Sequence, residues 1–132
     1  MPKQIRGVHH IILTVADPDR SDAFYRRILG VEIGGGNENV RWISCDNFLL
    51  AFQRAPHQPI PNDRFDENRI GLDHFAFAVD SRKQLEDLLI LLKEMNIPTA
   101  GIEFDPDGKE EYVCFRDPDN IQIEFYVGDY HD

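Results

Sequence analysis

The sequence predicts an α+β fold built from two tandem βαβββ modules. The main observation is an internal repeat: residues 7–17 (GVHHIILTVAD) resemble residues 71–80 (GLDHFAFAVD), and His10 matches His74, 64 positions later (74 minus 10). Both runs are rich in β-branched or aromatic residues and are bounded by glycine and aspartate, which is typical of a buried strand. A helical pattern and then further short strands follow each run.

Length, composition and charge limit the classes of function. The chain has 132 residues, 42% of them hydrophobic and 29% charged, which predicts a single globular domain with its own core. The net charge of -10 opposes a phosphate backbone and argues against a nucleic-acid partner. The two cysteines, Cys45 and Cys114, suit a reducing cytoplasm. No apolar run approaches the ~18 residues of a membrane span, so we expect a cytoplasmic protein without a membrane partner.

Module one covers about residues 5–55 and begins with a strand at residues 8–15. Asp17 can accept hydrogen bonds from the first turn of a helix, and Pro18 suits the first helical position. Gly30 is placed to end this helix.

Three short strands are expected to complete module one, at residues 31–33, 40–45 and 48–53. The glycine run at 34–37 lacks the features of a phosphate-binding loop and predicts a mobile turn. Asp46 and Asn47 predict the turn of a hairpin between the last two strands.

A polar, proline-containing stretch at about residues 56–70 is expected to be a linker, because proline removes backbone donors and favours extended chain. Module two, at about residues 71–128, repeats the plan of module one. Ser81 and Gln84 have the spacing of a capping box, which starts the second helix. Apolar residues at helical spacing predict its buried face: Leu85, Leu88, Leu89, Leu92 and Met95. Strands are expected at residues 99–104, 111–116 and 120–127.

A second repeat concerns the last strand of each module. Residues 46–52 (DNFLLAF) match residues 119–125 (DNIQIEF), so Glu124 corresponds to Ala51, 73 positions earlier (124 minus 51). A carboxylate within an apolar strand is costly to bury unless it is paired or ligates a metal. Duplicated modules usually pair about a pseudo-twofold axis, which would bring equivalent strands together.

This symmetry makes His10, His74 and Glu124 candidate metal ligands. Two imidazoles and one carboxylate form the facial set that binds Fe(II), Mn(II) or Zn(II) and leaves positions open for substrate. A lone histidine is more often a hydrogen-bonded core residue, but the repeated histidine and the anomalous glutamate favour a metal site. We expect His9 to point away from the metal, although a one-residue shift of register would exchange it for His10.

These motifs resemble the vicinal oxygen chelate superfamily. The resemblance rests on the strand, Asp-Pro and helix of the opening, on the Gly-Leu-Asp-His strand, and on residues 115–125 (FRDPDNIQIEF). Its members include glyoxalase I, ring-cleaving dioxygenases, fosfomycin-modifying transferases and bleomycin-binding proteins. The resemblance implies curved mixed sheets around a metal-centred cavity, a homodimer, and a divalent Fe(II), Mn(II), Zn(II) or Ni(II) ion held by His10, His74 and Glu124.

The chain departs from each subgroup of this superfamily. Ala51 stands where glyoxalase I-like members usually supply a fourth ligand. The fosfomycin transferases need basic residues near the C-terminus, but no Lys or Arg follows Arg116 here. Cys114 occupies roughly the position of a tyrosine that dioxygenases use for proton transfer. Bleomycin-binding members lack the metal, whereas this chain retains three ligands.

The sequence therefore predicts a metal-dependent enzyme that binds a small substrate through adjacent oxygens, with dioxygenase or glyoxalase-like lyase chemistry. The alternative is a metal-free binding or sequestration protein of the bleomycin-resistance type. Whether the modules pair within one chain or across two stays open, and no catalytic residue is assigned. Candidate substrate-binding residues are Gln53, Arg54, Tyr112, Arg116 and Tyr126.

Overall fold

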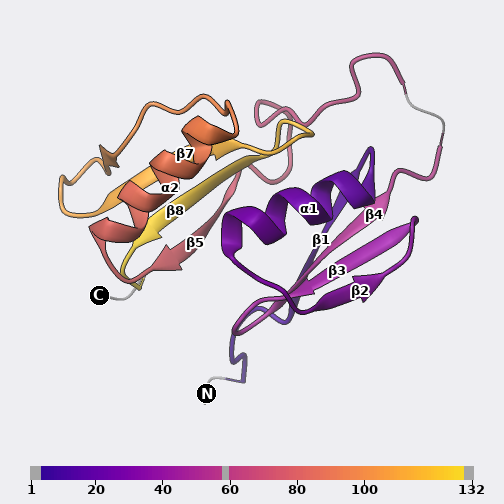
Figure 1. Cartoon of the computed structure of the whole chain (residues 1–132), viewed down its shortest axis with the longest axis horizontal. Coiled ribbons are helices and arrows are strands. Elements are labelled where there is room, and N and C mark those ends of the chain that lie inside the picture. Colours follow the sequence, from indigo (N-terminus) through magenta and orange to yellow (C-terminus); the bar gives the residue numbers. More distant parts are fainter. Residues whose placement is uncertain (1–3, 58–59, 130–132) are drawn as a thin grey trace. The chain divides into compact units, whose positions relative to one another are not determined.

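A computed structural model describes residues 4–57 and 60–129. The chain divides into two compact units between Asp63 and Arg64, and each unit runs strand, helix and three further strands (Figure 1). Both units are mixed four-stranded sheets with one helix. The expected α+β class and the two tandem modules are confirmed.

The first unit is a mixed sheet covered by a helix on one face. It consists of β1 (His10–Val15), α1 (Pro18–Leu29), β2 (Gly34–Gly36), β3 (Val40–Ser44) and β4 (Leu49–Arg54). The strand order is β1-β4-β3-β2, with β1 parallel to β4 and the other pairs antiparallel. Tyr25 of α1 stacks on Phe52 of β4 with ring centroids 5.0 Å apart, and both side chains are fully buried. The helix therefore covers the face of the sheet that carries Phe52.

The ends of α1 are formed by the residues that the sequence predicts. Asp17 Oδ1 accepts hydrogen bonds from the backbone N–H groups of Asp19 (3.1 Å) and Arg20 (3.4 Å). Pro18 occupies the first turn, and Gly30 ends the helix with a φ of 66°, a left-handed conformation that favours glycine.

The expected strand at residues 31–33 is wrong, and so is the mobile turn at 34–37. Strand β2 lies on the glycines themselves and pairs with β3. The backbones approach so closely that a Cβ on Gly34 would collide with the carbonyl oxygen of Trp42, and one on Gly36 with that of Val40. Only glycine permits this approach, and a strand without side chains has no periodicity to detect.

The second unit repeats the arrangement of the first. It consists of β5 (Phe75–Val79), α2 (Arg82–Glu94), β6 (Glu103–Phe104), β7 (Glu111–Arg116) and β8 (Gln122–Val127), in the sheet order β5-β8-β7-β6. As in the first unit, the outer strand β5 is parallel to its neighbour β8. Helix α2 buries Leu85, Leu88 and Leu92. The expected strand at residues 99–104 is shorter than predicted, because regular pairing with β7 covers only Glu103–Phe104.

The linker has no helix or strand among its described residues; residues 58–59 lie outside them. Its last part belongs to the second unit. The N–H of Phe65 donates to the carbonyl oxygen of Asp119 (3.0 Å), and the Asn120 amide donates back to the carbonyl oxygen of Phe65 (2.9 Å). Over the described residues, none of the helices has the length and apolar character needed to cross a bilayer.

Candidate metal centre

The strand registers place the repeated residues at equivalent positions in the two units. Ile12 of β1 lies opposite Ala51 of β4, and Ala76 of β5 lies opposite Glu124 of β8. Each candidate histidine precedes the outer-strand residue of its pair by two positions. Because side chains alternate along a strand, His10 shares the face of Ile12, which is the face that α1 does not cover.

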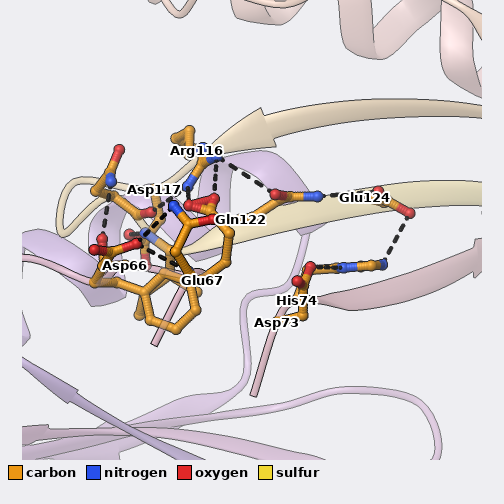
Figure 2. A network of polar contacts seen from close by, with 12 residues as sticks. Asp66, Glu67, Asp73, His74, Arg116, Asp117, Gln122 and Glu124 are labelled. Atoms are coloured by element: carbon orange, nitrogen blue, oxygen red, sulfur yellow. Dashed lines mark hydrogen bonds and ion pairs between the residues drawn. The ribbon is translucent and has the colours of Figure 1, made fainter. Parts of the chain in front are cut away.

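His74 and Glu124 come together in the second unit. The His74 Nε2 atom lies 3.4 Å from Glu124 Oε1, and its Nδ1 atom lies 2.7 Å from Asp73 Oδ1 (Figure 2). Glu124 is 7% exposed, whereas the His74 side chain is 37% exposed. The pair therefore joins a buried carboxylate to an imidazole that solvent can reach.

The contacts of His74 decide what can lie between the two side chains. An ionised Asp73 only accepts hydrogen bonds, so the Nδ1 atom of His74 carries a hydrogen. In a neutral imidazole the Nε2 atom is then an acceptor that faces another acceptor, Glu124 Oε1, whereas in an imidazolium it would donate a hydrogen bond to that oxygen. In the neutral form this pair of acceptors attracts a cation.

The spacing of the pair agrees with a shared ion. Two ligands about 2.1 Å from one ion, at an angle of about 90–109°, lie about 3.0–3.4 Å apart. The observed 3.4 Å between His74 Nε2 and Glu124 Oε1 lies within this range. It is longer than the ~2.7–2.9 Å of a charge-assisted hydrogen bond. The two side chains fit adjacent ligands of a divalent metal.

A row of polar contacts extends from Glu124 away from His74 (Figure 2). Gln122 Nε2 donates to Glu124 Oε2 at 3.3 Å, and Arg116 Nη2 donates to Gln122 Oε1 at 3.4 Å. Arg116 also forms an ion pair with Glu67, with contacts of 2.6 and 3.2 Å. These hydrogen bonds to Arg116 lower the pKa of Glu67, so its carboxylate stays ionised.

The tyrosines predicted to bind substrate lie next to each other on the sheet face that carries Glu124. Tyr112 of β7 pairs with Tyr126 of β8, and their rings stack at 5.1 Å with an interplanar angle of 2°. Burial, then the charge of Asp105, raises the pKa of Tyr126 to about 12. Burial, then the charge of Glu103, also raises the pKa of Tyr112. Near neutral pH both hydroxyl groups can donate a hydrogen bond, but neither is a base.

Cys114 lies directly opposite Glu124 in the β7–β8 pair. Burial, followed by the charge of Glu124, raises the pKa of its thiol. Cys114 is therefore a neutral group beside the candidate ligand and not a thiolate.

The two other predicted substrate-binding residues lie at the end of β4. Gln53 is exposed and pairs with Thr14, two positions along the strand from Ala51. The Arg54 guanidinium donates to the carbonyl oxygens of Glu38 (2.9 and 3.2 Å) and Ala16 (3.2 Å). Arg54 thus connects two backbone segments of the first unit.

His10 contacts His9, with the two Nδ1 atoms 2.8 Å apart. The two side chains therefore converge and do not take the opposite orientations that strand alternation would give, because His9 precedes the first residue of β1. Within either unit, no described group of three or more His, Cys, Asp or Glu side chains is gathered as around a metal ion.

Sequence reasoning missed three residues of this region: Asp73, Gln122 and Glu67. Gln122 could have been found, because it shares a strand face with Glu124 two positions later. Glu67 gave no signal, since it lies in the linker, 49 residues from its partner Arg116.

Two tandem βαβββ units, with a histidine and a carboxylate meeting on the helix-free face of one sheet, define a protein of the vicinal oxygen chelate type. The chain belongs to the Glyoxalase/Bleomycin resistance protein/Dioxygenase superfamily, whose family model matches residues 7–125. The resemblance noted in the sequence is confirmed.

The similarity to known proteins covers nearly the whole chain. The YwkD protein of Bacillus subtilis is 27% identical over 129 residues, covering 92% of this chain and 97% of that protein. The metallothiol transferase FosB of Staphylococcus epidermidis is 29% identical over 129 residues, covering 97% and 88%. A solved glyoxylase/bleomycin resistance protein/dioxygenase domain from Frankia sp. EAN1pec has a TM-score of 0.77 at 29% identity, covering 96% of this chain and 100% of that chain. Family and relatives together favour a metal-dependent enzyme.

Proposed function

We propose that this protein is a divalent-metal-dependent enzyme that binds a small substrate through two adjacent oxygens, with glyoxalase-like lyase or dioxygenase chemistry. The proposal rests on one observation. His74 Nε2 faces Glu124 Oε1 at 3.4 Å, while the other ring nitrogen, Nδ1, lies 2.7 Å from Asp73 Oδ1. His74 and Glu124 would hold the ion. His10 would complete the set, supplied by module one of the same chain or of a second copy.

The environment of the pair supports a metal site over a core hydrogen bond. A buried carboxylate is unfavourable unless a positive charge or several donors compensate it. Glu124 is buried, yet the His74 ring beside it is 37% exposed and so is not a core histidine. A half-open imidazole next to a buried carboxylate suits an ion that must also accept a substrate.

When bound, a divalent metal would act as a Lewis acid that polarises adjacent substrate oxygens and stabilises the negative charge that develops. Asp73 would hold the Nδ1 hydrogen of His74 and thus keep its Nε2 lone pair available. Tyr112, which stays protonated, would donate a hydrogen bond to a substrate on this face, whereas the Tyr126 hydroxyl is engaged by Asp105. Arg116 is neutralised by Glu67, which leaves it poorly suited to hold an anionic phosphonate.

The test is metal reconstitution under anaerobic conditions. Protein purified without chelator is analysed for metal, then loaded with Fe(II), Mn(II), Zn(II) or Ni(II), and its melting temperature is measured. We expect stoichiometric binding and a higher melting temperature, because an ion that binds only the folded state stabilises it. Absence of both would overturn the proposal and favour the metal-free binding protein.

A substrate panel on the loaded protein separates the reaction classes. A catechol tests ring cleavage, a methylglyoxal–thiol adduct tests the lyase reaction, and an epoxide with a thiol tests the transfer chemistry suggested by the name of the FosB relative. We expect turnover of the catechol or the adduct. We also propose a homodimer, which a monomeric mass by light scattering would contradict.

A further inference from the structure

We propose that Gln122, held by Arg116, is a positioning residue that makes Glu124 a ligand through one oxygen only. This inference rests on the proposed metal-dependent function and assigns a role within its site. Gln122 takes up Glu124 Oε2 with a hydrogen bond of 3.3 Å, while Oε1 is the atom that faces His74. A free carboxylate could otherwise bind a metal with both oxygens or turn between them.

The chemistry of Arg116 determines which way the Gln122 amide points. A guanidinium group has only donors, so the atom of Gln122 that lies 3.4 Å from it must be the amide oxygen. The amide nitrogen then necessarily faces Glu124. A flipped amide would place its NH₂ group against the guanidinium and its oxygen against the carboxylate, and both contacts would be repulsive.

Arg116 is itself fixed by contacts on its far side. Its guanidinium binds the Glu67 carboxylate through both Nη atoms, at 2.6 and 3.2 Å, and donates to the carbonyl oxygen of Asn120 at 3.1 Å. Glu67 lies two residues after Phe65, whose backbone is bonded to the β7–β8 turn. Arg116 is therefore held to the β7–β8 turn in two ways: directly by the carbonyl oxygen of Asn120, and indirectly through Glu67.

The charges along this row suit a metal ligand. A guanidinium that contacted Glu124 directly would place a positive charge beside the ion and weaken its binding. Here Glu67 balances Arg116, and the neutral amide of Gln122 separates the guanidinium from Glu124. The arrangement fixes the orientation of the Glu124 carboxylate without neutralising its negative charge, which stays available to the cation.

The experiment compares wild type with Gln122→Met, which has a similar length and no amide. Mn(II) titration by calorimetry should show binding weakened by ~10–100-fold, as is typical when the hydrogen-bond partner of a metal ligand is lost. Infrared difference spectra, loaded minus metal-free, should show a smaller separation of the two carboxylate stretching bands as Glu124 begins to bind through both oxygens. Glu124→Gln assigns these bands.

Two further variants keep the inference falsifiable if Gln122→Met does not fold. Glu67→Gln weakens the anchor of Arg116 and should shift affinity and band separation in the same direction by a smaller amount. Gln4→Met, an exposed glutamine outside the sheet, is the matched control and should change neither.

The outcomes separate the two proposals. If wild type binds no metal, the proposed function fails and this inference with it. If wild type binds metal and Gln122→Met binds equally tightly, or binds more weakly with unchanged carboxylate bands, the positioning role is refuted while the metal-dependent function stands.

Discussion

The two modules share one fold but differ on the face of the sheet that their helices leave uncovered. On the last strand of module two Glu124 follows Gln122 by two positions, and on the last strand of module one Ala51 follows Leu49 in the same way. Arg116 pairs with Gln122, whereas the residue that pairs with Leu49 is Ser44. The three strand residues of the contact row, Glu124, Gln122 and Arg116, thus have small or apolar counterparts in Ala51, Leu49 and Ser44.

The helix-covered faces, in contrast, are alike. Phe52 on β4 and its counterpart Phe125 on β8, 73 positions later as for Ala51 and Glu124, are both buried large aromatics. The comparison teaches that the core of the duplicated module is retained in both copies, while the polar contacts of Glu124 occur in one copy. In the proposed site, module one would contribute His10.

The largest expected effect tests the shared core. Phe52→Ala and Phe125→Ala should each lower the free energy of unfolding by about 3–5 kcal/mol, because each leaves a cavity in a packed interior. Urea denaturation followed by circular dichroism measures both. A loss below about 1 kcal/mol in one variant only would show that the two cores are not equivalent.

Next in size is the loss of a candidate ligand. His74→Ala should weaken divalent metal binding by more than ~100-fold, which exceeds the usual effect of losing a hydrogen-bond partner of a ligand. His57→Ala is the matched control. The His57 side chain is exposed in the linker, with its Nε2 atom 3.7 Å from Asp63 Oδ2. Its removal should leave the metal affinity unchanged. Calorimetry on both variants would contradict the site if the two affinities were equal.

A third experiment makes module one resemble module two. Ala51 is 5% exposed and lies between Ile12 and Trp42, so Ala51→Glu buries a carboxylate without a partner. The metal-free variant should lose about 2 kcal/mol of stability. Because residue 51 stands where glyoxalase I-like proteins supply a ligand, added Zn(II) or Ni(II) should restore part of this loss. Equal melting temperatures with and without metal would place position 51 outside the site.

The smallest expected effect distinguishes the two helix starts. Asp17 bonds two N–H groups of α1 directly, so Asp17→Ala should cost about 1 kcal/mol. At α2 the Gln84 side chain accepts from the N–H of Ser81 at 3.1 Å, a contact that Ser81→Ala retains. That variant should cost about 0.5 kcal/mol, the lower end of the range for a lost N-cap side chain, because half of the capping box remains. Equal losses of stability in the two variants, measured by thermal denaturation, would contradict this difference between the two helix starts.

Much of the fold could be predicted from the sequence because its signals are local. Helix α1 lies between Asp17 and Gly30 as predicted, and the offsets that match His10 with His74 and Ala51 with Glu124 are reproduced by the strand registers. Strand β2 could not be predicted in this way, because glycines carry no side-chain pattern and the close approach of β3 requires them.

By itself the sequence determined the two modules, their helices and the candidate ligands, since capping, periodicity and repetition depend on residues close together in the chain or copied along it. Only the tertiary structure decided that His74 Nε2 faces Glu124, and that Glu67 and Arg116 meet across 49 residues to hold Gln122. Such contacts depend on where a folded backbone brings distant side chains, and no local pattern records that.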